Sequence, residues 1–220
     1  MKNTFTKIAK FCRQIVYEES EDIVFRKDLS NYDYVLKNKG LSCIDANADN
    51  LKQFLQDKPK LWRQLYITQS YLANGYHGIL LILDETVIGY VWWARYSPSK
   101  PEFCHPHLKQ FDLQLTETDA WGFDLFILPE YRGGGMSTDV LYLLLEHIRS
   151  HGCRFSWGCA QKENLPALWV HKLHRFEKVK SVRSIIYFRV LLYCDIDGGC
   201  WFAKNSLFFG KQRFDYRFLF

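Results

Sequence analysis

The stretch YRGGGMST, residues Tyr131 to Thr138, places three consecutive glycines between an apolar run and a helical pattern. The run AWGFDLFIL at residues 120–128 predicts a strand, and residues 136–150 predict a helix that Gly152 ends. A strand that passes through glycines into a helix exposes unpaired N–H groups at the positive end of the helix dipole. The stretch therefore predicts a turn that binds an anion.

Two common phosphate-binding motifs do not fit this turn. A nucleotide-hydrolase phosphate loop needs Lys followed by Ser or Thr after its last glycine, and Met136 stands at the Lys position. A dinucleotide fingerprint needs a glycine where Thr138 stands and an acidic residue about 20 positions later, and both are missing. From the residues alone, two readings stay open: another anion site, or a flexible glycine loop that binds nothing.

The segment ILPEYRGGGMS resembles the signature segment of the GNAT superfamily, the acyl-CoA-dependent N-acetyltransferases. In that signature, Arg or Gln is followed after two residues by Gly and, one residue further, by Gly or Ala. Arg132, Gly135 and Ser137 occupy these places, with Ser137 as the departure from the family pattern. A serine hydroxyl can donate a hydrogen bond to a phosphate, so the departure is tolerable.

A second segment, ENLPALWVHKLHRFEKV, resembles the next block of the same family. Asn164 is followed at the family's offsets by Ala167, His171 and Phe176. The two blocks stand in the family's order and separation, and the resemblance extends over roughly residues 41–193. It implies an α/β fold, a GNAT-like mixed central sheet flanked by helices.

The resemblance also implies a cosubstrate, acetyl-CoA or another acyl-CoA, and an amine acceptor. The glycine turn would cradle the diphosphate, and the pantetheine arm would lie between two core strands that splay apart. The residues that would bind the coenzyme are Phe126, Ile127, Leu128, Arg132, Gly133, Gly134, Gly135, Met136, Ser137, Asn164 and Ala167. No metal is implied.

The helix expected from about Leu165 has two faces. One is an apolar stripe of Leu165, Leu168, Trp169 and Leu173, and the other carries Asn164, Ala167, His171 and His174. His171 stands where the family usually has a Tyr that protonates the departing thiolate. Imidazole titrates near neutrality, so His171 is a candidate catalytic residue, whereas a surface or capping role is favoured for His174.

Asp124 is the second candidate catalytic residue. It matches an acidic residue frequent in the family, but strand alternation places Trp121, Phe123 and Leu125 on the substrate face and Asp124 on the other. A bulge in the strand would change this direction. A buried, hydrogen-bonded structural carboxylate is an equally good interpretation.

Composition narrows the class of protein. The chain has 220 residues, 48% of them hydrophobic, and a net charge of +5 without a basic block, which favours a globular protein over one that binds nucleic acid. Seven scattered cysteines, the lack of an apolar leader and the lack of a membrane-length run predict a cytoplasmic protein with reduced thiols. His105 and His107 beside Cys104 favour a substrate-side loop over a metal site.

The predicted organisation has three parts. Residues 1–40 form an N-terminal extension with a helix over 4–19 and a short strand, DIVFRKDL. Residues 41–193 form the acyltransferase domain, which includes two helices, a hairpin that turns at Asp84 and Glu85, and a β-rich stretch at 181–193. Residues 194–220 form a β-rich C-terminal extension packed on the core, or else an acyl tunnel or homodimer interface.

Three functions compete. The first is transfer of an acyl group, with acetyl foremost, from acyl-CoA to a primary amine by direct attack on the thioester. The second transfers a longer fatty acyl chain to an amine of a peptide or small molecule. The third is a catalytically silent acyl-CoA-binding module, because Phe123 and His171 stand where the family often has Glu and Tyr.

Overall fold

The residues that the structure describes form one mixed sheet of nine strands. The computed structural model describes residues 17–56, 62–97, 105–187, 190–195 and 200–202. The strand order is β2-β3-β4-β5-β6-β1-β7-β8-β9, and only β5 and β6 run parallel. The strands are β1 (Tyr17–Asp28), β2 (Leu41–Asp45), β3 (His77–Leu83), β4 (Thr86–Arg95), β5 (Asp119–Ile127), β6 (Phe155–Gln161), β7 (Glu177–Tyr187), β8 (Val190–Asp195) and β9 (Cys200–Phe202).

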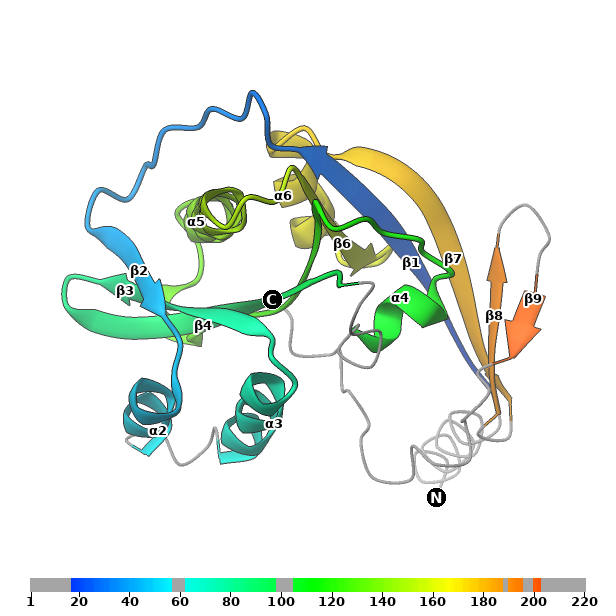
Figure 1. Cartoon of the computed structure of the whole chain (residues 1–220), viewed down its shortest axis with the longest axis horizontal. Helices are drawn as coiled ribbons and strands as arrows, with labels where there is room; N and C mark the ends of the chain where they lie inside the picture. Colours follow the sequence, from blue (N-terminus) through cyan, green and yellow to red (C-terminus); the bar gives the residue numbers. More distant parts are fainter. Residues whose placement is uncertain (1–16, 57–61, 98–104, 188–189, 196–199, 203–220) are drawn as a thin grey trace, which may run out of the picture.

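Helices cover both faces of this sheet, which confirms the predicted α/β fold class. Figure 1 shows α2 (Ala48–Gln56) and α3 (Trp62–Ala73) on one side of β3 and β4, with α5 (Met136–Ser150) on the other. The helix α6 (Leu165–Leu173) lies beside α5 and packs on β1 and β6, and the short α4 (Pro106–Gln110) precedes β5.

The helix α5 shows why the sequence folds as predicted here. Its buried residues recur three and four positions apart, from Met136 through Val140 and Leu144 to Ile148. It begins after Gly135 and ends before Gly152, and both glycines have positive φ. Basic residues in its last turn complement the helix dipole. The predicted bounds, residues 136–150, are confirmed.

The β3–β4 hairpin is also confirmed. Asp84 and Glu85 form its turn, with φ of 45° and 67°, as a two-residue hairpin requires. The register shifts opposite Gly89, where a Cβ would clash with the carbonyl oxygen of Phe126. The predicted bulge or close approach at Gly89 is both: β4 and β5 approach so closely here that only glycine fits.

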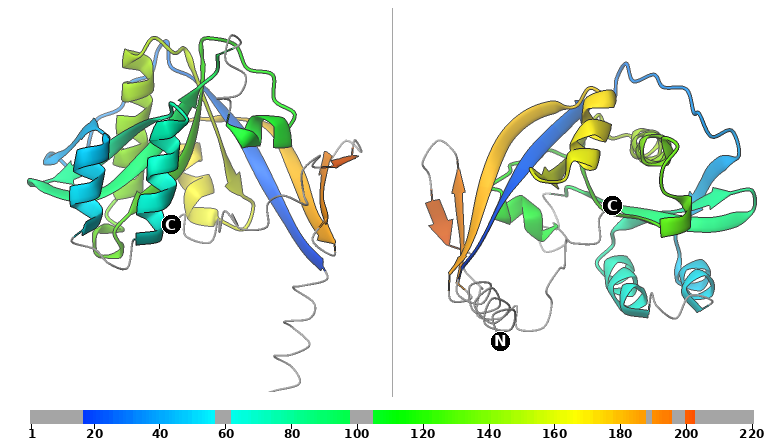
Figure 2. Two further views of the ribbon diagram at one scale, coloured as in Figure 1. Left: turned by 60° about the horizontal axis from the view of Figure 1, so that its bottom comes forward. Right: turned by 180° about the vertical axis from the view of Figure 1, so that it is seen from behind.

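Strand β1 differs from the expectation for the N-terminal segment. Residues 4–16 of the predicted helix lie outside the described residues, but Tyr17–Glu19, predicted as its end, pair with Ile185–Tyr187 as strand. Strand β1 has 12 residues and lies between β6 and β7, antiparallel to both. Figure 2 shows β1 running beside β7, with α6 packed over this part of the sheet. Pairing partners on both sides explain why the strand is longer than its apolar core.

The β-rich end of the chain follows the prediction in outline. The stretch predicted at 181–193 is two antiparallel strands, β7 and β8. Beyond them, β9 pairs with β8 through Leu192↔Phe202 and Cys194↔Cys200 at the edge of the sheet. Residues 203–220, the candidate tunnel or dimer interface, lie outside the described residues.

Candidate active site

The central feature of the candidate site is a fork between the two parallel strands. Strands β5 and β6 pair only over Asp119–Trp121 and Phe155–Trp157, and diverge beyond these residues. Glycines stand at both branches: a Cβ on Gly158 would lie 3.6 Å from the carbonyl oxygen of Gly122. Glycines at both positions let the two backbones lie close together where the strands begin to diverge.

A bulge in β5 reshapes the outer branch of the fork. Tyr90 of β4 pairs with Phe126, whereas Trp92 pairs with Phe123, so β5 carries one extra residue. Asp124 lies in this bulge with a φ of 45°, in the left-handed region. The alternation of side chains between the two faces of β5 is therefore interrupted at Asp124. The sequence analysis named such a bulge as the condition that would change the direction of Asp124.

The glycine turn lies where β5 ends. Gly133, Gly134 and Gly135 have φ of 106°, 58° and 84°, which L side chains rarely adopt, and Gly135 caps α5 without any side-chain hydrogen bond. The N–H groups of these glycines and of Ser137 make no hydrogen bond with the residues that the structure describes. Four unpaired donors thus stand at the positive end of a 15-residue helix.

Other predicted backbone donors of this region are already engaged. The N–H of Leu128 donates to the carbonyl of Ile88 at 2.8 Å, and that of Met136 donates to the carbonyl of Gly133 at 2.9 Å. Both side chains are buried in the core. Arg132 is exposed, and its Nε donates to the carbonyl of Ile127 at 2.9 Å. Leu128 and Met136 therefore support the site by packing, not by donating to a ligand.

A cation reaches the glycine turn from the segment between β1 and β2. The Cδ of Lys37 lies 3.6 Å from the Cβ position of Gly135. This segment is fixed by Asp139 in the first turn of α5, which accepts hydrogen bonds from the Tyr34 hydroxyl (2.7 Å) and from the Lys37 and Asn38 N–H groups (3.2 and 2.8 Å). Sequence reasoning missed Lys37, because nothing local distinguishes it from Lys39.

The carboxylate of Asp139 is held ionised by these donors. Burial alone would raise its pKa, but the hydrogen bonds from Tyr34, Asn38 and Lys37 bring the pKa below its usual value. A buried carboxylate at a helix N-terminus is also favoured by the helix dipole. The hydrogen bonds to Asp139 therefore fix the segment that carries Lys37.

His171 lies on the inner side of the fork. Its Nδ1 donates to the carbonyl of Ala167 at 2.8 Å, which leaves Nε2 as the acceptor, 3.9 Å from the Cβ position of Gly158. The ring stacks on Phe25 with centroids 4.5 Å apart. Burial lowers the pKa of His171, and the hydrogen bond to Ala167 offsets only part of this effect. The imidazole is therefore neutral near pH 7 with a free lone pair beside the fork.

The two faces of α6 differ in burial. Of the apolar stripe, Leu165, Trp169 and Leu173 are 70%, 58% and 46% exposed, whereas Ala167 and Val170 are buried. The reason is that the small face fits against β1 and β6, where Ala167 contacts a cluster of Phe25 and Ala160. Asn164 caps the helix through a hydrogen bond from the Ala167 N–H.

His174 is at the C-cap of α6, as its capping interpretation expects, but it is buried, not on the surface. Its Nε2 donates to the carbonyl of Thr138 at 2.9 Å, so its Nδ1 accepts from the Tyr32 hydroxyl. Burial lowers the pKa of His174 to about 4. This histidine ties α6 to α5 and to the segment after β1.

Asp124 lies on the opposite face of the sheet from His171, towards α3. Its carboxyl is half-buried and accepts a hydrogen bond from the Tyr71 hydroxyl. Burial raises the pKa of Asp124 to about 6, against the smaller lowering by Tyr71. A carboxylate with this pKa is mostly ionised at pH 7 and is a better proton acceptor than an ordinary Asp.

Aromatic rings surround the neighbourhood of Asp124. Tyr71 and Tyr76 contact Phe123 edge to face, with centroids 5.1 and 5.3 Å apart, and His105 lies 4.1 Å from the same ring. The Nδ1 of His105 accepts from the His107 N–H, and burial lowers the pKa of both histidines, that of His107 to about 4. His105 therefore lies against Phe123 at the predicted acceptor side.

The described residues contain no group of three or more His, Cys, Asp or Glu that could hold a metal ion. Cys104, which precedes the two histidines, lies outside these residues. Within the same part of the chain, no helix has the length and apolar character needed to cross a membrane.

Comparisons with known proteins identify the relatives of this fold. The model of the Acetyltransferase (GNAT) family matches residues 45–176, more than half of the 220-residue chain. No curated protein matches the sequence.

Solved structures share the fold at low identity. A conserved protein of unknown function from Staphylococcus epidermidis is 10% identical with a TM-score of 0.56, and the match covers 81% of this chain and 65% of that one. A GCN5-related glucosamine N-acetyltransferase region of a fungal multi-domain GH3 β-N-acetylglucosaminidase is 15% identical with a TM-score of 0.57, covering 81% and 22%. A tandem GNAT protein from the clavulanic acid biosynthesis pathway is 14% identical with a TM-score of 0.55, covering 82% and 58%. This chain therefore spans less than two thirds of each of these proteins.

Proposed function

Because the chain belongs to the GNAT acetyltransferase family, we propose that it transfers an acyl group, acetyl first among the candidates, from acyl-CoA to a primary amine. The observation that carries this proposal is a run of four unpaired backbone N–H groups, at Gly133, Gly134, Gly135 and Ser137, where β5 leads into α5. Such a turn suits a diphosphate, and the fork suits a narrow pantetheine chain.

The coenzyme fits residues already described. The four N–H groups bind the diphosphate, with the exposed Arg132 as a second source of positive charge. The pantetheine arm lies along the diverging β5 backbone at Phe126 and Ile127, past Gly158. Asn164 and Ala167 act indirectly, since the Asn164 cap and the small Ala167 set the position of α6. CoA supplies the activated thioester.

Asp124 is proposed as the base that takes the proton of the attacking amine. Its raised pKa leaves it ionised at neutral pH yet basic enough to accept a proton in the transition state. Tyr71 orients the carboxylate, and the rings around Phe123 limit access of water. In this proposal Asp124, whose side-chain direction is changed by the bulge, takes the role of the Glu that the family often has at the position of Phe123.

His171 is proposed as the group that returns a proton to sulfur. The reaction forms a C–N bond and breaks the C–S bond: the proton lost by the amine goes to Asp124, and the departing thiolate takes a proton from water through His171, so solvent closes the proton balance. The neutral imidazole has its free Nε2 beside the fork, where it accepts a proton, through water, and passes it on. Its lowered pKa favours rapid release of that proton to a thiolate.

We propose three parts of the chain, of which the acyltransferase unit depends on the N-terminal extension. Residues 41–193 form the acyltransferase unit, with extensions at 1–40 and 194–220, in a cytoplasmic protein whose dimerisation is a possibility to test. Because β1 of the first extension lies between β6 and β7, the unit needs residues 17–28 to complete its sheet. A truncation that begins at residue 41 is expected to be insoluble or unfolded.

Two measurements test the function. Calorimetric titration with CoA is expected to show one saturable site, and a thiol-release assay across several acyl-CoA lengths and an amine panel is expected to show turnover. Absence of CoA binding would refute the proposal. Binding without thiol release for any amine would identify a silent acyl-CoA-binding module, and a preference for long thioesters would identify a fatty acyl transferase.

A further inference from the structure

The carboxylate of Asp124 carries a charge that no described residue balances. Its side chain is half-buried, and no described Lys, Arg or His forms an ion pair with it. The Tyr71 hydroxyl, which donates to it, is neutral. Because a partly desolvated carboxylate is normally paired with a cation, a molecule that binds here is expected to bring a positive charge.

Aromatic rings surround this carboxylate, and one of them is accessible. Tyr71 and Tyr76 are 4% and 8% exposed, and His105 is 4% exposed. Phe123, which all three rings contact, is only half-buried. Phe123 is therefore the ring of this cluster that a bound molecule can reach. Ring faces attract ammonium groups, and they also pack against other rings.

The polar groups beside Phe123 add neither positive charge nor open hydrogen-bonding capacity. Burial lowers the pKa of His105 and of His107, so both rings are neutral near pH 7. The Nδ1 of His105 accepts from the His107 N–H, and the Tyr71 hydroxyl donates to Asp124. An acceptor rich in hydroxyl groups would therefore exchange water for aromatic carbon here, which costs free energy, whereas an apolar ring would not.

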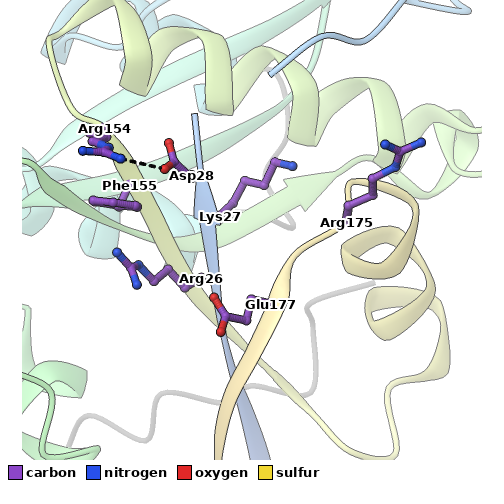
Figure 3. Close-up of a pocket in the computed structure, with 7 residues that line it drawn as sticks. All are labelled: Arg26, Lys27, Asp28, Arg154, Phe155, Arg175 and Glu177. Carbon is purple, nitrogen blue, oxygen red and sulfur yellow. Dashed lines mark hydrogen bonds and ion pairs between the residues drawn. The ribbon is translucent and has the colours of Figure 1, made fainter. Parts of the chain in front are cut away.

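A cavity at the other end of the sheet has the opposite charge. It has a volume of about 420 Å³ and lies at the amino-terminal end of β6, whereas the glycine turn follows the carboxyl end of the parallel strand β5. Figure 3 shows its lining, with four cations and two carboxylates, and one carboxylate, Asp28, is paired with Arg154. Excess positive charge does not suit an ammonium group, so this cavity is not the place for an amine acceptor.

We infer that the acceptor is an arylalkylamine, with its ammonium group at Asp124 and its ring against Phe123. This inference rests on the proposed function and names the acceptor class of the same site. The short alkyl chain separates the charged end from the ring, as the adjacent positions of Asp124 and Phe123 require. Phe123, at a position where the family often has Glu, is then the residue that determines acceptor specificity.

Four small molecules separate the contribution of the ring from that of the charge. Phenethylamine carries both, phenethyl alcohol only the ring, ethanolamine only the ammonium, and glucosamine an ammonium on a polyol. Each is titrated into the full-length protein without acyl-CoA, and amide chemical shifts are followed at residues 71, 76, 105, 123 and 124. We expect phenethylamine to bind at least about tenfold more tightly than each of the others. Equal or tighter binding of any of the three would overturn the inference.

Three variants test the two contacts. Phe123→Leu keeps an apolar side chain but loses the ring, and Asp124→Asn loses the charge. We expect phenethylamine to bind about fivefold and about tenfold more weakly, respectively. Trp169→Leu removes an exposed ring from α6, on the other face of the sheet, and should bind phenethylamine as the wild type does. Equal weakening in Trp169→Leu and Phe123→Leu would contradict a specific ring contact, and the wild-type titrations decide the question even if a variant fails to fold.

CoA binding and thiol release distinguish this inference from the proposed function. With acetyl-CoA, kcat/KM is expected to be at least about tenfold higher for phenethylamine than for glucosamine. Thiol release that favours glucosamine would overturn the acceptor class and keep acyl transfer. Selective binding of phenethylamine by a protein that does not bind CoA would keep the amine site and overturn acyl transfer.

Discussion

The Nε2 of His171 lies 3.9 Å from the position that a Cβ on Gly158 would occupy, so the helix α6 and the strand β6 together define the inner wall of the fork. Gly158→Ala would place a methyl group in ordinary van der Waals contact with both His171 and the Gly122 carbonyl. We expect the variant to fold with a nearly unchanged thermal midpoint, and KM for acyl-CoA to rise about tenfold, or about 1.4 kcal/mol. An unchanged KM would show that the pantetheine arm does not pass this point.

His171→Gln tests the proton transfer to sulfur. Glutamine keeps a side chain of similar reach but cannot accept and release a proton, so we expect kcat to fall about 100-fold with little change in KM. Steady-state kinetics at saturating acyl-CoA measure both constants. His151→Gln, which changes an exposed histidine at the C-cap of α5, is the matched control and should retain full turnover.

Asp124→Asn should move activity and stability in opposite directions. The pKa of Asp124 in the folded chain, about 6, lies above its usual 3.8, so between these values the folded chain binds more protons than the unfolded chain. The contribution of Asp124 to the free energy of unfolding therefore falls as the pH rises from 3.8 to about 6. Above this window the ionised carboxylate costs at most about 3 kcal/mol.

The neutral amide of Asp124→Asn removes that cost. We expect the free energy of unfolding at pH 7.5, from urea denaturation, to rise by about 1–2 kcal/mol, while kcat falls about 100-fold. In the wild-type enzyme, activity should decline as the pH drops through about 6, because Asp124 becomes protonated. Full activity of the variant would assign Asp124 to a structural role.

Lys37→Ala tests the cation beside the glycine turn. The variant should bind CoA about fivefold more weakly, since one charge close to the diphosphate is lost, but should use an acyl-pantetheine, which has no diphosphate, as well as the wild type does. Calorimetry and thiol release provide the two readings. Lys39→Ala, an exposed neighbour, is the control, and equal weakening in both variants would rule out a specific contact.

Much of the fold could be predicted because its signals are local. Three consecutive glycines predicted the start of α5, and Asp84 and Glu85 predicted a hairpin, because turn chemistry depends on a few adjacent residues. The structure shows positive φ at all five residues. The place of β1 could not be predicted in this way. Its partners, β6 and β7, lie more than 100 residues further along the chain, and local pattern says nothing about distant pairing.

The same distinction between local and distant signals applies to the residues of the candidate site. The glycine turn and the position of His171 followed from motif spacing, and an alternation pattern flagged the direction of Asp124 as dependent on a bulge. Lys37 was not predicted, because it reaches the turn through a segment anchored by Asp139, about 100 residues away. The sequence separated the two faces of α6 but did not indicate which one packs on the sheet, because that depends on how closely Ala167 fits against β1 and β6.

The insertion of β1 between β6 and β7 sets the order in which the chain can mature. During translation β1 leaves the ribosome first, yet both of its neighbours emerge only after residues 155–187 have been made. Both edges of β1 therefore stay unpaired until residues 155–187 have been synthesised, which favours slow folding and dependence on chaperones.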